Sequence, residues 1–169
     1  MSGSAANDAN AMRAGLKRIY DSLPDIAGGK AVAFFKMNFR RQGWVYNATL
    51  NKWVPRKGKL DPGRNILVKS GTLSRSIRIT RTGKDFVAIG SDVPYAKAHN
   101  EGAQIIKRVN VRGFSRNIRG KEQQVKSFSR NMKTVIPQRQ FLGESPDVYK
   151  SAEREFVRQL EEVLKSIKK

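Results

Sequence analysis

The side chains able to carry catalysis are few. The chain contains one histidine, His99, and no cysteine, which excludes disulfides, thiolate metal sites and cysteine nucleophiles. A Ser/His/Asp triad would have to use His99, with Ser70 or Ser91 as its nucleophile. Asn100 and Glu101 follow His99 directly, and adjacent residues on a helix do not face one another. The sequence therefore supplies no group that would orient His99 as a base, and we expect a structural histidine in a protein that is not an enzyme.

Metal and nucleotide chemistry have equally little support. Asp85, Asp92 and Glu101 are scattered among basic residues, without the recurring spacing of carboxylates that bind a metal. Neither a GxxxxGK[ST] nor a GxGxxG phosphate-binding loop occurs. We expect neither a metal nor a cofactor.

Charge is the strongest signal in the composition. The 34 Lys and Arg against 14 Asp and Glu leave a net charge of +20, which indicates a polyanionic partner or an acidic protein surface. Residues 107–133 alone hold nine basic residues and one acid, Glu122, a net charge of 9 − 1 = +8.

This basic segment predicts a protruding hairpin or arm, because a structureless loop of its length is unusual in a compact domain. Phe114 and Phe128 interrupt its charges, a combination that suits phosphate tracking with aromatic anchoring. An ordinary solvated loop is the alternative. The residues expected to contact a partner or DNA are Arg112, Arg116, Arg119, Lys121, Lys126, Arg130 and Lys133.

The rest of the chain must position this arm. With 169 residues, one domain is expected, divided into a helical region (1–43), a Trp/Pro loop (44–69), a core of motifs (70–102), the basic arm (103–136) and a C-terminal helix region (137–169). Apolar spacing predicts a first helix over about 8–23, interrupted by Pro24, and a second that ends near Gly43. Trp44 and Trp53 are expected to anchor the loop that follows, with exposed rings that neighbouring molecules would cover.

The fold class expected is α+β, with a small antiparallel sheet packed between long N- and C-terminal helices. Alternating residues around the turn at 82–85 predict a hairpin. Pro94 opens a short helix that Gly102 ends, and Ser145 caps a terminal helix that starts at Pro146. Lys165, Lys168 and Lys169 complement the end of that helix.

No apolar run approaches the roughly 20 residues that cross a bilayer, and the start of the chain lacks the order of a secretory signal. We expect a protein without membrane contact, made and used inside a cell.

Four short motifs then occur in a fixed order. They are Lys52-Trp53-Val54-Pro55; Ser-Gly-x-Leu-x-x-Ser-Ile with Gly71, Leu73 and Ile77; Tyr-Ala-x-x-His-x-x-Gly with Tyr95, His99 and Gly102; and Pro-x-Arg-x-Phe-Leu-Gly with Arg139 and Phe141. In these motifs and their order, about residues 30–169 resemble the phage virion morphogenesis family of tail-completion proteins. The long basic insert before Pro137 departs from that pattern.

The resemblance implies a structural virion protein of a tailed bacteriophage, which completes the tail and connects it to the head. Its place would be the neck, as a ring around the DNA channel with a hexamer favoured, after assembly in the host cytoplasm. Its partners would be portal or adaptor proteins and tail-terminator or tail-tube proteins, with non-specific contact to genomic DNA also open. The motif residues would have structural roles.

Two placements of the arm compete. It can line the channel and surround DNA, or it can lie across acidic protein surfaces during assembly. We favour protein docking, because a passage for fast DNA movement should not grip its cargo. The rival function is a free, non-specific nucleic-acid-binding protein, and a tail-associated hydrolase is a distant third.

Overall fold

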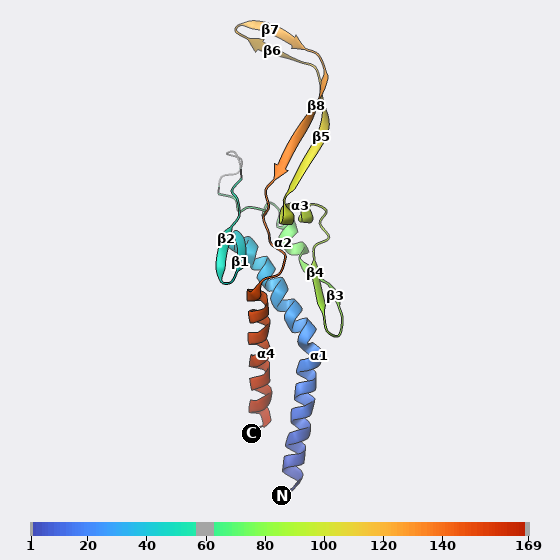
Figure 1. The fold of residues 1–169 in the computed structure, drawn as a ribbon, viewed down its shortest axis with the longest axis vertical. Coiled ribbons are helices and arrows are strands. Elements are labelled where there is room, and N and C mark those ends of the chain that lie inside the picture. The colour runs from blue at the N-terminus through green and yellow to red at the C-terminus, as the bar shows by residue number, and fades with distance from the viewer. Residues whose placement is uncertain (1, 57–62, 168–169) are drawn as a thin grey trace.

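Two long helices, two short helices and four pairs of strands make up the described part of the chain, residues 2–56 and 63–167 of a computed structural model. In chain order the elements are α1 (Ser2–Arg41), β1 (Gly43–Tyr46), β2 (Thr49–Lys52), α2 (Thr72–Ser76), β3 (Arg78–Thr82), β4 (Val87–Gly90), α3 (Ala96–Glu101), β5 (Ala103–Val111), β6 (Phe114–Ile118), β7 (Lys121–Val125), β8 (Phe128–Ile136) and α4 (Pro146–Ile167). The long helices lie at one end of an elongated molecule and β5–β8 project from the other (Figure 1). The predicted α+β class is confirmed. Its antiparallel strands pair only in twos within the described residues, so they form ribbons instead of one sheet.

Helix α1 is a single helix of 40 residues with Pro24 in its interior, so the prediction of two helices separated at Pro24 was wrong. An internal proline removes one backbone hydrogen bond and kinks the helix, and α1 changes direction part-way along its length (Figure 1). Packing on both sides of the proline keeps the helix continuous. A Cβ on Gly28 would lie 2.6 Å from Cδ1 of Ile79, so the β3–β4 hairpin rests directly on the helix backbone.

The segment that follows α1 begins as a hairpin, where the sequence predicted an extended loop. Strands β1 and β2 pair from Gly43↔Lys52 to Tyr46↔Thr49, and Asn47 and Ala48 turn between them with φ angles of 48° and 59°. Two successive positive φ angles match the twist of a two-residue hairpin. The sequence did not indicate this turn, because neither of its two central residues is glycine. Residues 57–62 of the predicted loop lie outside the described residues.

Both tryptophans are buried, at 7% exposure for Trp44 and 6% for Trp53, so the expectation of exposed rings was also wrong. Their rings join the core: Trp53 meets Phe39 edge-on, and Trp44 lies parallel to Phe35. The indole Nε1–H of Trp53 donates to the carbonyl of Gln140 at 2.8 Å, which satisfies its polar end.

The central motifs fold as predicted. Strands β3 and β4 form an antiparallel hairpin with Arg78 opposite Gly90. Helix α3 ends at Gly102, whose φ of 80° suits a residue without a side chain. Leu73, Ile77 and Phe141 are buried together with the aromatic residues of α1 in one core.

The predicted N-cap of α4 is also confirmed. The amide of Asp147 donates to Ser145 Oγ at 3.3 Å, and the amide of Val148 donates to the Ser145 carbonyl at 3.1 Å. Lys165 lies in the last turn, whereas Lys168 and Lys169 lie outside the described residues.

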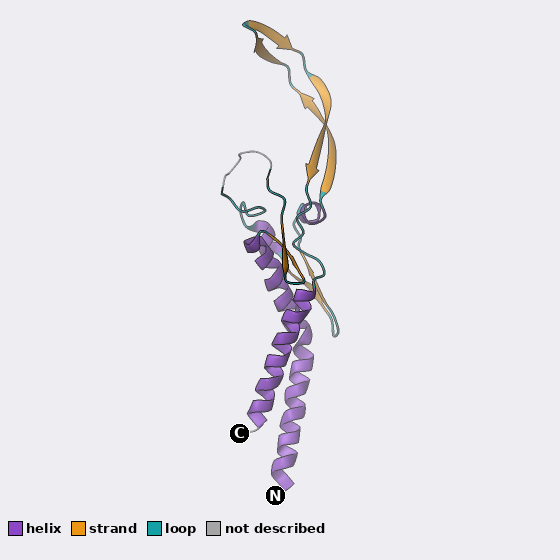
Figure 2. Ribbon diagram, turned by 60° about the vertical axis from the view of Figure 1, so that its left-hand side comes forward, coloured by secondary structure: helices purple, strands orange, loops and turns teal. Residues whose placement is uncertain are grey.

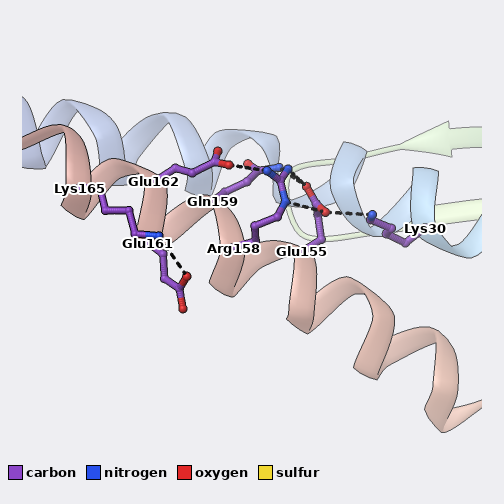
Figure 3. Close-up of polar contacts among 7 residues, drawn as sticks. All are labelled: Lys30, Glu155, Arg158, Gln159, Glu161, Glu162 and Lys165. Atoms are coloured by element: carbon purple, nitrogen blue, oxygen red, sulfur yellow. Dashed lines mark hydrogen bonds and ion pairs between the residues drawn. The ribbon is translucent and has the colours of Figure 1, made fainter.

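Helix α4 runs alongside the N-terminal part of α1 in both ribbon views (Figures 1 and 2). Close approach is possible because Gly15 faces Val163, whose Cγ1 would lie 2.5 Å from a Cβ at that position. An ion pair joins the helices further along, with Lys30 Nζ 2.9 Å from Glu155 Oε2 (Figure 3). Hydrogen bonds from Arg158, Gln159 and Lys30 to the Glu155 carboxylate hold the pKa of that group well below its usual value.

Candidate functional site

The arm consists of two strand pairs that follow one another. Strands β5 and β8 pair over nine positions, from Ala103↔Ile136 to Val111↔Phe128. Beyond them β6 and β7 pair from Phe114↔Val125 to Ile118↔Lys121. At about 3.4 Å per residue the first pair alone extends roughly 30 Å, and both views show the ribbon reaching away from the other elements (Figures 1 and 2).

Every basic residue expected to contact a partner is exposed on this ribbon. Arg130 and Lys133 lie on β8, Arg116 on β6 and Lys121 on β7. The remaining three are Arg112 and Lys126, between the strand pairs, and Arg119, in the turn at the tip. Within residues 2–56 and 63–167, none of these side chains forms an ion pair.

The register divides these charges between the two faces of the ribbon. Side chains alternate faces along a strand, so Arg130, opposite Val109, and Lys133, opposite Ile106, lie on opposite faces of β5–β8. Arg116 and Lys121 share one face of β6–β7 with Phe114. The structure thus brings together only part of the predicted set and leaves positive charge on both sides of the arm.

Apolar side chains are exposed beside the charges. Ile106 is 65% exposed and Val135 64%, while Phe114 and Phe128 are 45% and 43% exposed. An isolated two-stranded ribbon is marginally stable in water, and exposed apolar area of this kind marks interaction surfaces. The arm therefore has the composition of a surface that another molecule covers.

The base of the arm is fixed by the last two sequence motifs. The amide of Arg139 donates to the His99 carbonyl at 2.8 Å. A Cβ on Gly102 would lie 3.1 Å from the Gln138 amide nitrogen, so this glycine permits the two ends of the arm to enter side by side. Phe141, two residues after Arg139, is completely buried.

Arg139 as a whole residue is 7% exposed. Its Nε donates to the Val54 carbonyl at 3.0 Å, and its Nη2 to the Pro55 carbonyl at 3.5 Å. Burial, and secondarily the charge of Arg56, lower the pKa of Arg139. The arginine thereby ties the Trp-Val-Pro motif to the segment that leaves the arm.

His99 lies partly buried beside Arg139 and Tyr95. Burial lowers its pKa, with a further contribution from the positive charge of Arg139, and Tyr95 meets its ring edge-on at 5.9 Å between centroids. The two candidate nucleophiles form other hydrogen bonds: Ser70 Oγ lies 2.8 Å from Thr72 Oγ1, and Ser91 Oγ lies 2.7 Å from Ser76 Oγ. Within residues 2–56 and 63–167, no group of three or more His, Asp or Glu side chains is placed to hold a metal.

Comparison with known proteins adds one decisive match. A model of the phage virion morphogenesis family matches residues 34–161, which span the four motifs, the whole arm and most of α4. The chain belongs to the phage virion morphogenesis family. The resemblance inferred from the motifs is therefore confirmed. Membership of the family indicates that the protein takes part in the assembly of phage particles. No curated protein and no solved structure matches it significantly. None of its helices in the described residues is long and apolar enough to span a membrane.

The sequence did not identify Asn100 as important in this virion morphogenesis protein. Its side-chain Oδ1 accepts hydrogen bonds from the amides of Phe141 and Leu142, both at 2.9 Å, and its Nδ2 donates to the Leu142 carbonyl at 3.1 Å. Asn100 thus clips α3 to the segment that follows the arm. The only signal in the sequence was its position inside the Tyr-Ala-x-x-His-x-x-Gly motif, next to His99.

The other motif residues occupy structural positions. Gly71 precedes α2 with a φ of 73°, a left-handed conformation that favours glycine. Leu73 and Ile77 are 3% and 0% exposed in the core. Their arrangement supports the folded body that carries the arm.

Proposed function

We propose that this protein is a non-enzymatic structural component of the neck of a tailed bacteriophage, where it completes the tail and connects it to the head. Copies assemble as a ring around the DNA channel, with a hexamer favoured. Portal or adaptor proteins lie on one side, and tail-terminator or tail-tube proteins on the other. The family supports the morphogenetic part of this proposal, and the exposed basic arm is the single observation that carries the rest.

The arm docks on acidic protein surfaces of neighbouring subunits. The charges of the arm lie on both faces of its ribbon. A ribbon inserted between protein subunits contacts a partner on each face, whereas a DNA duplex would contact only one face. Burial of the exposed Ile106 and Val135 against an apolar protein surface would stabilise the complex. A phosphate backbone offers no apolar surface to cover these side chains. Charge of opposite sign on the partners accelerates and orients the encounter.

The test is complementation of a phage that lacks the gene, with an arm-deleted protein in which a two-residue turn replaces residues 105–134. We expect the variant to fold, because the arm contributes none of the buried core residues, and we expect heads and tails to remain unjoined. A matched control replaces Lys17, Lys36 and Lys150 with Gln, three basic residues outside the arm, and should give normal particles. Normal particles from the arm-deleted protein would refute docking by the arm.

Non-specific DNA binding is the second candidate, favoured by the net charge of +20. The logarithm of such an affinity falls with the logarithm of salt concentration by roughly 0.9 for each phosphate contacted. Filter binding of a duplex at two salt concentrations separates the candidates. The proposed docking role predicts weak binding that the arm deletion hardly changes, and the rival role predicts tight, steeply salt-dependent binding that the deletion abolishes.

A further inference from the structure

A cavity of about 380 Å³ lies beside the base of the arm and is lined with positive charge. Its basic residues are Arg56, Arg64, Lys69, His99 and Arg139. No Asp or Glu within the described residues lines it. The rest of the lining includes the aliphatic side chains of Ile66, Leu67, Val68 and Leu73.

Two guanidinium groups in this cavity have no carboxylate partner within residues 2–56 and 63–167. Arg139 is 7% exposed and donates hydrogen bonds to the neutral carbonyls of Val54 and Pro55, with no ion pair to any described residue. Arg56 Nη2 donates to the carbonyls of Arg64 and Asn65. Its Nη1 is buried and has no hydrogen-bond partner in the described residues. A buried charge is costly unless an opposite charge pairs with it.

The histidine adds a second polar atom without a hydrogen-bond partner among the described residues. His99 Nδ1 is buried and has no hydrogen-bond partner among the described residues, although the ring lines the same cavity. Leu67, on the cavity wall, has a φ of 60°. Strained backbone of this kind persists only where the surrounding structure holds it, and it clusters at active and ligand-binding sites.

We propose that this cavity binds a carboxylate carried by an acidic segment of a partner protein. A carboxylate accepts paired hydrogen bonds from planar guanidinium groups such as those of Arg56 and Arg139. The aliphatic wall suits the methylene stem of a Glu or Asp side chain, whereas a phosphodiester brings hydrated sugars to the opening. The site is separate from the arm and provides a second, concave contact next to its base.

The probe is the peptide acetyl-Ala-Ala-Glu-Ala-Ala-amide, titrated into the full-length protein, with the Gln peptide as its neutral counterpart. Because His99 is the single histidine, its ring protons give one resolved set of NMR signals that report directly from the cavity. We expect a saturable shift of these signals with the Glu peptide and none with the Gln peptide.

Variants locate the binding. Arg56→Gln should weaken the peptide affinity roughly tenfold, as expected for one charge-assisted hydrogen-bonding group. Lys69→Gln changes an exposed side chain that lines the cavity and should weaken the peptide affinity by a smaller factor. Because this residue is exposed, the variant tests the proposal independently of any effect of Arg56→Gln on the fold. Arg116→Gln on the arm removes the same charge and should leave the affinity unchanged.

Three results would overturn the proposal. They are an absence of any saturable shift, an equal loss of affinity in Arg116→Gln and in the two cavity variants, and a short single-stranded oligonucleotide that shifts the His99 signals at lower concentration than the Glu peptide. The complementation result for the arm is independent of all three, so each idea can fail alone.

Discussion

Replacement of Asn100 by alanine tests whether the clip at the base of the arm holds the folded body together. The substitution removes two acceptor contacts to the amides of Phe141 and Leu142 and one donor contact to the Leu142 carbonyl. At about 1 kcal/mol net for each hydrogen bond, the free energy of unfolding should fall by about 3 kcal/mol. For a chain of this size the corresponding decrease in Tm is roughly 6–12 °C.

The measurement is urea denaturation followed by tryptophan fluorescence, because the buried Trp53 donates to Gln140 next to the clip. Asn110→Ala is the matched control. Asn110 accepts a single hydrogen bond from Ser129 Oγ at 2.6 Å on the exposed arm, and its loss should cost less than about 0.5 kcal/mol. Asn100→Asp keeps the two acceptor contacts and loses the donor, so its stability should lie between those of the wild type and Asn100→Ala.

If Asn100→Ala unfolds within about 0.5 kcal/mol of the wild type, the three hydrogen bonds do not carry the connection, and the account of the arm's base is wrong. A large loss in the Asn110→Ala control would contradict the same account, because it would mean that the arm itself contributes to global stability.

Three further predictions concern the helices and the histidine. Gly15→Ala should destabilise the protein by about 1–3 kcal/mol, because its Cβ would meet Val163 at 2.5 Å. Gly29→Ala, which has nothing within 4 Å, should stabilise it by roughly 0.5–1 kcal/mol through helix propensity, and thermal unfolding of both variants measures the difference. Because the folded-state pKa of His99 lies below its ordinary value of 6.5, the unfolded chain binds more protons there, so stability should fall as the pH drops below 6.5 and His99→Gln should remove that component. Glu155 has a lowered pKa against an ordinary 4.5, so its contribution should be complete above pH 4.5 and be lost as the pH falls further, a loss that Glu155→Gln should abolish in acid-unfolding curves.

Local chemistry in the sequence was sufficient for several elements. The Ser145-Pro146-Asp147 signal gave the start of α4 correctly, and the alternation around residues 82–85 predicted the β3–β4 hairpin. Such features depend on neighbours in the chain, so the sequence contains them directly.

Long-range packing defeated the other predictions. Pro24 does not end α1, since contacts at Gly28 and Gly15 hold the helix on both sides of it, and these partners are distant in the sequence. Trp44 and Trp53 are buried because aromatic residues of α1 pack on them. The charged cavity was not predicted either, because Arg56, His99 and Arg139 come from three separate segments that meet only in the fold.

The two ends of the arm enter the body next to each other, at Gly102 and Gln138. A pull on the tip would therefore stretch both strands in the same direction and would not peel β5 from β8. The tension would pass through the His99–Arg139 backbone bond and the Asn100 side chain to the fully buried Phe141. Mechanically, the ribbon acts as a two-legged tether anchored in the core, where Phe141 packs against Phe39 of α1 and passes the load to that helix.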